Sequence, residues 1–228
     1  MAKKIFITGT GTDVGKTYVT ALIVKKLKQN GKNPAYYKAA MSGNDRDEAG
    51  KLIPGDALFV KNISGISQSL EEMCPYIYEN AVSPHLASRI EGNPVKLPIV
   101  KEGFEKVCKA YDYVTMEGSG GILCPICYDE EKIWLEDIIK ELSLSSLIIA
   151  DAGLGTINSV VLTVEYMRAK NIPILGIIFN HYHPGSTMEE DNLKMCEEMT
   201  GVQVLACVKD GDTELDIDIE KLMACYQE

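Results

Sequence analysis

Apolar runs typical of buried strands alternate with runs of helical period along the whole chain. The strand-like runs cover residues 4–8, 34–39, 112–117, 146–151, 173–179 and 202–208. The helical runs cover residues 16–29, 98–110, 135–143, 157–170, 187–199 and 213–225. Some strands, such as residues 147–150, are apolar at every position, which is typical of strands covered on both faces. The alternation predicts an α/β fold with a mostly parallel, doubly wound sheet and helices on both faces.

One stretch, residues 40–97, departs from this alternation. It is rich in Gly, Asn, Ser and Pro, and we expect short helices in it near residues 55–61 and 83–90. No internal repeat, low-complexity tract or linker divides the 228 residues. We therefore expect a single domain over residues 1–228, in which residues 40–97 form an excursion over the functional face.

A glycine-rich turn joins the first strand-like run directly to the first helical run. Residues 9–17 read GTGTDVGKT. Glycines let the backbone approach a polyanion, and the N–H groups of the turn and of the helix start point at it. Lys16 is placed to reach the outer phosphates of a nucleoside triphosphate, and the Thr17 hydroxyl is placed to bind Mg²⁺. The turn therefore predicts a P-loop and a P-loop NTPase-like fold.

The spacing of this turn differs from the common P-loop by one residue. Its first glycine would fall at Thr10, whereas the chain has Gly9. The dinucleotide fingerprint fits less well, because its third glycine comes one place late, at Gly15, and because such a turn has no use for Lys16. A plain strand–turn–helix with chance glycines is the remaining alternative. The pair Lys16 and Thr17 favours a nucleoside triphosphate.

Polar or glycine-rich segments follow each strand-like run, at the edge where parallel sheets bind ligands. They are residues 9–17, 38–43, 117–121, 151–158, 180 and 209–211. Glu117 ends a strand opposite Thr17, a place where this fold holds Mg²⁺. Lys38 is either a second cation for phosphate charge or a surface residue at a strand end. Residues 153–158 open a helix, so they form either a carboxylate-binding helix start or an ordinary turn.

Composition limits which partners the protein is expected to bind and which cellular compartment it is expected to occupy. The net charge is −10, which on average repels nucleic acid and anionic membranes, so a phosphate site must be a local positive region. No apolar run reaches 18 residues, and the N-terminal apolar stretch is too short for a secretory signal, so we expect a cytoplasmic protein. Seven cysteines fit a reducing compartment. Cys124 and Cys127 form a CxxC pair, which in other proteins can bind a metal or undergo redox chemistry. Because the sequence has no second CxxC pair, we interpret these two cysteines as inert loop thiols.

The motifs, taken in order, resemble those of the dethiobiotin synthetase family. The matching segments are residues 9–17, 38, 42–43, 83–85, 117–121 and 180. The resemblance runs from residue 4 to about residue 210, and the longer P-loop is itself typical of that family. It implies ATP-dependent carboxylation and ring closure of 7,8-diaminopelargonate with CO₂ or bicarbonate. The reaction would pass through a phosphorylated carbamate and give dethiobiotin, ADP and phosphate.

The resemblance also implies roles for single residues. Lys16 and Lys38 would be the catalytic cations, offsetting charge on the carbamate and the transferring phosphoryl group. The implied Mg²⁺ ligands are Thr17, Asp56 and Glu117. The implied substrate-binding residues are Ser42, Gly155, Thr156 and Asn158. The implied nucleotide-binding residues are Thr12, Asp13, Val14, Gly15, Lys16, Thr17, Tyr18, Asp56, Glu117, Gly118, Ser119, Gly120, Asn180 and His181, with Asn180 reading the adenine edge.

Members of that family are homodimers with substrate near the interface, so the resemblance also implies a homodimer. We expect small-molecule substrates and neither nucleic-acid nor membrane partners. One departure from the family concerns residues 207–211, which read CVKDG where the family has a proline. This departure predicts weaker selectivity for the adenine base.

Two other functions are alternatives. A ParA/MinD-like ATPase switch carries an extra lysine early in its P-loop, where this chain has Thr10, Gly11 and Thr12. The acidic charge and the acidic segment 215–228 also disfavour DNA and membrane surfaces. An amidating cobyrinate-type synthetase of the same fold would need a glutaminase domain, which we do not expect here.

Overall fold

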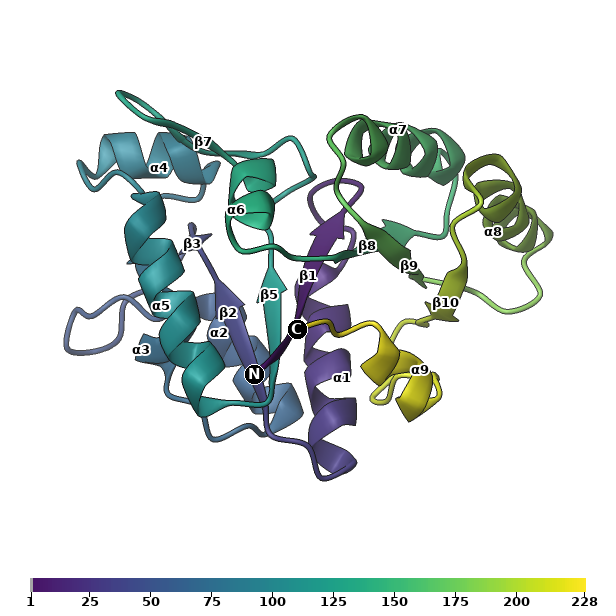
Figure 1. Cartoon of the computed structure of the whole chain (residues 1–228), viewed down its shortest axis with the longest axis horizontal. Helices are drawn as coiled ribbons and strands as arrows, with labels where there is room; N and C mark the ends of the chain where they lie inside the picture. Colours follow the sequence, from purple (N-terminus) through teal and green to yellow (C-terminus); the bar gives the residue numbers. More distant parts are fainter. Residues whose placement is uncertain (1) are drawn as a thin grey trace.

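The fold is built around a six-stranded parallel sheet with the strand order β10-β9-β8-β1-β5-β2 (Figure 1). A computed structural model describes residues 2–228. The strands of this sheet are β1 (Lys3–Gly9), β2 (Pro34–Lys38), β5 (Tyr113–Glu117), β8 (Ser146–Asp151), β9 (Ile174–Asn180) and β10 (Val204–Cys207). Every neighbouring pair in the sheet is parallel, which confirms the α/β fold that the sequence predicts.

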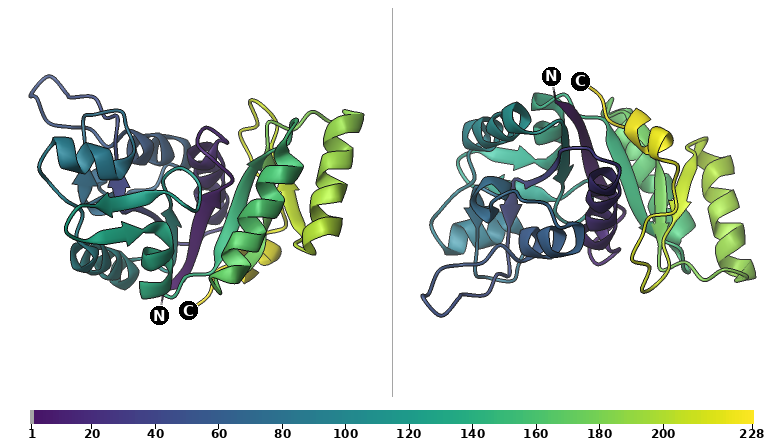
Figure 2. Two further views of the ribbon diagram at one scale, coloured as in Figure 1. Left: turned by 90° about the horizontal axis from the view of Figure 1, so that it is seen from above. Right: turned by 90° about the horizontal axis from the view of Figure 1, so that it is seen from below.

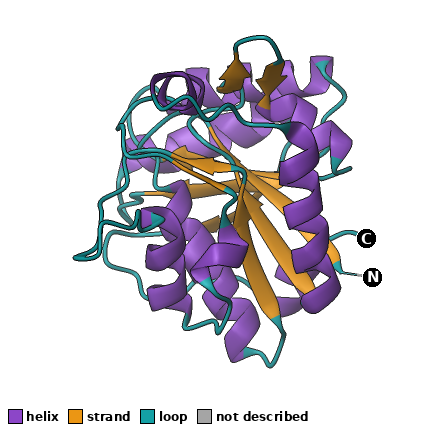
Figure 3. Ribbon diagram, turned by 90° about the vertical axis from the view of Figure 1, so that its left-hand side faces the viewer, coloured by secondary structure: helices purple, strands orange, loops and turns teal. Residues whose placement is uncertain are grey.

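Helices cover both faces of the sheet (Figures 2 and 3). The helices are α1 (Lys16–Gln29), α2 (Gly55–Ser64), α3 (Leu70–Met73), α4 (Pro84–Ile90), α5 (Leu97–Ala110), α6 (Leu135–Glu141), α7 (Thr156–Ala169), α8 (Thr187–Thr200) and α9 (Ile219–Ala224). Ile5 and Ile7 pack in the core on the side of α1 and α9, whereas Phe6 packs in the core that contains α5, α6 and α7. Strands that read as apolar throughout therefore do bury both of their faces.

Two small strand pairs lie outside the main sheet, and the sequence pattern did not predict them. The first is the parallel pair β3 (Ala40–Met41) and β4 (Tyr76–Ile77), within the excursion at residues 40–97. The second is the antiparallel pair β6 (Pro125–Tyr128) and β7 (Lys132–Trp134). Runs of two to four residues are too short to show an alternating pattern.

The expected helix over residues 213–225 was wrong in its first half. The helix α9 starts only at Ile219, after Asp218, whose side chain accepts a hydrogen bond from the backbone N–H of Lys221. Leu215 and Ile217 are buried in the core beside α1, although they lie in an irregular segment. Their apolar spacing suggested a helix, but tertiary packing buries them without one. The other main elements agree with the expected ranges to within two residues at either end.

The two ends of the described chain lie side by side (Figure 1). Lys4 and Gln227 exchange two backbone hydrogen bonds, of 2.7 and 3.1 Å. Among residues 2–228, no helix combines the length and the apolar character needed to cross a membrane.

A side chain completes the hydrogen bonding of the edge strand β2. Gln68 is fully buried, and its amide oxygen accepts from the Tyr36 N–H at 2.8 Å. Its amide nitrogen donates to the Tyr36 carbonyl at 2.9 Å. Gln68 thus gives Tyr36 the two bonds that a further strand would give, which buried peptide groups require. This contact holds the strand that ends in Lys38.

We predict that Gln68→Leu destabilises the protein by about 2–4 kcal/mol, because two buried backbone groups lose their partners. Urea unfolding followed by circular dichroism measures this free energy. The matched control is Gln29→Leu, since the exposed Gln29 bonds only to the exposed Glu214 and its loss is expected to cost no more than about 0.5 kcal/mol. Equal stabilities of the two variants would contradict the prediction.

Candidate active site

The turn after β1 folds into a compact loop closed by Gly15. This glycine caps α1 with a φ of 81°, a left-handed conformation that side chains rarely adopt. A Cβ atom at Gly15 would lie 2.0 Å from Asn180 Nδ2, so the loop and the end of β9 are in close contact. Both the backbone conformation and the contact with Asn180 therefore require a glycine at position 15 of the motif GTGTDVGKT.

Lys16 lies over this loop. Its side chain is buried, and its Nζ donates to the Gly11 carbonyl at 2.8 Å. Burial lowers the pKa of Lys16 below its ordinary value, while the negative charge of Glu117 acts in the opposite direction. A buried lysine held against backbone carbonyls near the start of a helix is the arrangement that binds terminal phosphates in P-loops.

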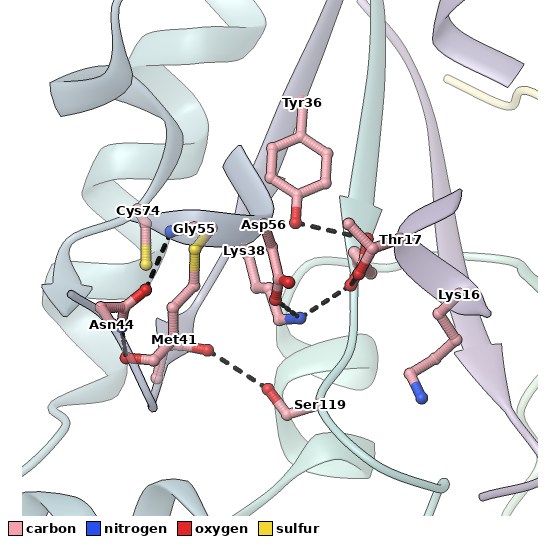
Figure 4. Close-up of polar contacts among 12 residues, drawn as sticks. Lys16, Thr17, Tyr36, Lys38, Met41, Asn44, Gly55, Asp56, Cys74 and Ser119 are labelled. Atoms are coloured by element: carbon pink, nitrogen blue, oxygen red, sulfur yellow. Dashed lines mark hydrogen bonds and ion pairs between the residues drawn. The ribbon is translucent and has the colours of Figure 1, made fainter. Parts of the chain in front are cut away.

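A buried ion cluster joins the ends of the neighbouring strands β2 and β5. Lys38 and Glu117 end these strands and are register partners. Lys38 Nζ lies 2.7 Å from Glu117 Oε1 and 2.6 Å from Asp56 Oδ2, where Asp56 belongs to the first turn of α2 (Figure 4). Thr17 Oγ1 donates to the same Glu117 oxygen at 2.9 Å. The cluster therefore brings together residues from α1, α2, β2 and β5.

Electrostatics favour the charged forms of Lys38 and Asp56 in this cluster. Burial alone would lower the pKa of Lys38, but the carboxylates of Glu117 and Asp56 outweigh it and raise that pKa. Burial opposes ionisation of Asp56 as well, yet Lys38 holds the pKa of Asp56 below its usual value. Tyr36 donates its hydroxyl to the second Glu117 oxygen at 3.3 Å. The two carboxylates are thus preformed oxygen ligands of the kind that Mg²⁺ prefers.

The loop and the ion cluster open onto one cavity of 780 Å³. Most of the predicted site residues line it, namely Thr12, Asp13, Gly15, Lys16, Thr17, Tyr18, Lys38, Ser42, Asp56, Glu117, Ser119 and Gly120. The cavity has room for a polyphosphate and a small substrate together, and cations and carboxylates meet on its wall. Asp56, which the resemblance alone suggested, lies directly against Lys38.

Other predicted residues lie outside this cavity. Val14 and Gly118 belong to the lining segments but do not line it. Asn180 is buried behind the P-loop, where its Nδ2 donates to the Val14 carbonyl at 3.3 Å, and its Oδ1 has no partner among the described residues. His181 lies 2.8 Å through Nδ1 from Asp151 Oδ2. Contact with a nucleotide therefore stays a prediction for these residues.

The turn before α7 is also separate from the cavity. Gly155 and Asn158 are exposed, whereas Thr156 is buried with a hydroxyl that has no partner among the described residues. Within residues 2–228, none of these three residues lines the cavity. The implied role of these three residues in binding substrate remains a prediction.

Sequence reasoning missed part of the cavity wall. Cys124, interpreted as an inert loop thiol, lines the cavity, and burial raises its pKa while Lys16 acts in the opposite direction. Residues 81–84 also line it, between the short strand β4 and α4. Residues 83–84 gave two signals in the sequence, a match to the family motif and the Ser-Pro start of a helix, but neither shows what the preceding loop covers.

Comparison with solved structures shows the fold that this chain shares. The MinC:MinD cell division protein complex of Aquifex aeolicus superposes with a TM-score of 0.57 at 13% identity, covering 98% of this chain and 86% of that one. A ParA family ATPase of Chlorobium tepidum gives a TM-score of 0.55 at 14% identity, covering 98% and 90%. These similarities confirm the P-loop NTPase-like fold and extend no further.

Sequence comparison identifies the family. A family model described as an AAA domain matches residues 3–213. The ATP-dependent dethiobiotin synthetase BioD of Brachyspira hyodysenteriae is 54% identical over 95% of this chain and 96% of its own length. The protein of the same name from Clostridium botulinum strain Loch Maree is 46% identical over the full length of both chains. With these matches and the lysine–carboxylate site in place, the chain belongs to the ATP-dependent dethiobiotin synthetase family.

Proposed function

We propose that this protein makes dethiobiotin from 7,8-diaminopelargonate, CO₂ and ATP. The observation that carries the proposal is the single cavity that contains both the P-loop lysine Lys16 and the cluster of Lys38, Asp56 and Glu117. A relative 54% identical over 95% of the chain carries the name of that activity. We expect residues 1–228 to work as one ATP-binding domain.

The chemistry needs positioning and charge neutralisation more than covalent help from the protein. One amine of the substrate attacks CO₂ and loses a proton, giving a carbamate. A carbamate oxygen then attacks the γ-phosphorus of ATP, and ADP leaves. The second amine attacks the carbonyl carbon of the mixed anhydride and loses a proton, the C–O bond to phosphate breaks, inorganic phosphate leaves, and the ureido ring closes. Negative charge builds up on oxygens throughout, which matches two lysines on one wall, Lys16 and Lys38.

The residues present fit a magnesium ion. Thr17, Asp56 and Glu117 would hold it, because the carboxylates of Asp56 and Glu117 already converge on one cation, the Lys38 ammonium, and the Thr17 hydroxyl bonds to Glu117. Bound there, Mg²⁺ would neutralise charge on the outer phosphates of ATP. Lys16 and the backbone of residues 12–18 would hold those phosphates. Ser42, which lines the same cavity, would hold the diamine.

The adenine base is expected beside Asn180 and His181. The buried Oδ1 of Asn180 has no partner within residues 2–228, and an acceptor left open in this way suits the exocyclic amine of adenine. The neighbouring loop, residues 207–211, lacks the family's proline, so we expect weaker discrimination against other bases. A panel of nucleoside triphosphates in which ATP exceeded the others by more than about a hundredfold would contradict this expectation.

We also infer a homodimer in the cytoplasm, with no nucleic-acid or membrane partner. Leu154 is 91% exposed and Leu162 is 61% exposed, and both adjoin the turn that holds Gly155 and Asn158. Such apolar surface suits a second copy, which would place this turn near a substrate site at the interface. Sedimentation equilibrium is expected to give twice the chain mass of 25.1 kDa, and a monomer at micromolar concentration would contradict the inference.

The reaction itself is tested by phosphate release from MgATP with bicarbonate, with and without 7,8-diaminopelargonate. We predict release that depends on the diamine and equals the dethiobiotin formed, which mass spectrometry quantifies. Release that is indifferent to the diamine, with no ring product, would instead favour a P-loop ATPase with another task.

We predict that Lys38→Met lowers kcat by at least about a hundredfold, because the reacting oxygens lose a positioned cation. The matched control is Lys101→Met, since Lys101 forms an equally short ion pair of 2.6 Å with Glu141 on the exposed surface. The control variant is expected to keep normal turnover. If Lys38→Met retained kcat within threefold of the control, Lys38 would be a structural residue only.

A further inference from the structure

Asn44 is a buried side chain that no part of the proposed reaction uses. It is 5% exposed and lies in the excursion between β3 and α2, just after the predicted substrate residue Ser42. Its amide forms three hydrogen bonds, and each of them ends on the backbone of a different segment (Figure 4 shows two of the partners, Met41 and Gly55).

One of these bonds holds the start of α2. Asn44 Oδ1 accepts from the Gly55 N–H at 2.9 Å. The residue at the N-cap of this helix is Pro54, which has no side-chain oxygen and makes no cap of its own. Asn44 therefore satisfies an N–H group at the helix start, one residue before Asp56. Asp56 is the carboxylate that lies 2.6 Å from Lys38.

The other two bonds reinforce the contact between the segments at Met41 and Tyr78, which the Tyr78 N–H also joins by donating to the Met41 carbonyl at 2.8 Å. Asn44 Nδ2 donates to the Met41 carbonyl at 2.9 Å and to the Tyr78 carbonyl at 2.8 Å. Met41 precedes Ser42, and both line the cavity. The chain after Tyr78 leads to residues 81–84, which line the same cavity. A single amide thus links the segment that carries a candidate metal ligand to two segments of the candidate substrate wall.

We propose that Asn44 is a positioning residue that fixes Asp56 relative to Ser42 and to residues 81–84. It acts through the backbone and touches neither substrate nor metal. The P-loop takes no part in its three bonds, so the phosphate-binding part of the cavity does not depend on it. This inference rests on the proposed function, because it assigns the two sides of the cavity to metal and diamine.

The test is the kinetics of Asn44→Ala. We expect the KM for 7,8-diaminopelargonate and the Mg²⁺ concentration for half-maximal rate to rise about tenfold each, the scale typical of lost supporting hydrogen bonds. At saturating Mg²⁺, the KM for ATP is expected to stay within about twofold, because the P-loop is unchanged. KM does not depend on how much of the enzyme is folded, so partial unfolding cannot imitate this pattern.

A second variant separates the two sides of the amide. Asn44→Asp keeps an acceptor for the Gly55 N–H but turns the donor that faces Met41 and Tyr78 into another acceptor. It is therefore expected to raise the KM for the diamine as much as Asn44→Ala does, and the Mg²⁺ requirement less. Equal increases of both constants in the two variants would contradict this assignment.

A control for general destabilisation is Thr200→Val. Thr200 is also buried and its hydroxyl also makes two backbone hydrogen bonds, to Cys196 and Val202, but it lies at the end of α8. This variant is expected to lose stability but to keep the KM for the diamine, the KM for ATP and the Mg²⁺ requirement of the wild type. The inference is overturned if Asn44→Ala behaves like Thr200→Val, or if its KM for ATP rises with the others. If wild-type enzyme makes no dethiobiotin, the proposed function fails instead.

Discussion

The site depends on one interaction, the buried ion pair between Lys38 and Glu117. Taking two charges out of water is costly, and breaking such a pair by removing one partner leaves an uncompensated charge. The register of the sheet offsets this cost by placing the two charges side by side, because Lys38 and Glu117 end neighbouring parallel strands as direct partners. Asp56 and Thr17 then complete the hydrogen bonding of the pair. The positions of α1, α2 and β2 are therefore tied together at the point where chemistry is expected.

The groups around this pair bear on how an acidic protein can attract a polyphosphate. The net charge of −10 opposes anion binding at long range, so attraction must be local and partly shielded from water. Lys16 supplies that local positive charge on the wall of the cavity, whereas Glu117 and Asp56 balance the charge of Lys38. The neighbouring carboxylates both stabilise the buried ammonium and offer ligands to a divalent cation. Tyr36 donates its hydroxyl to Glu117, and Gln68 in turn holds Tyr36 in the edge strand.

The parts of this structure that depend on local pattern could be predicted from the sequence. The periodicity of α1 and the apolar run of β8 give elements whose bounds the structure reproduces, and the P-loop motif fixes what lies between β1 and α1. Contacts between distant segments could not be predicted in this way. Asn44 holds Gly55 and Tyr78 across loops without periodicity, and the contact of Asp56 with Lys38 depends on where α2 packs. At Leu215 and Ile217 the sequence pattern predicted a helix that does not form, because buried residues in an irregular segment can have helical spacing.

The central claim is that metal, phosphate and substrate meet around the Lys38–Glu117 pair. The most direct measurement is a crystal structure of the protein with Mg²⁺, a non-hydrolysable ATP analogue and 7,8-diaminopelargonate. The account predicts Mg²⁺ on oxygens of Thr17, Asp56 and Glu117, the terminal phosphates at Lys16, and the diamine in the same cavity beside Lys38 and Ser42. A metal ion bound away from Glu117, or a diamine bound outside this cavity, would contradict it.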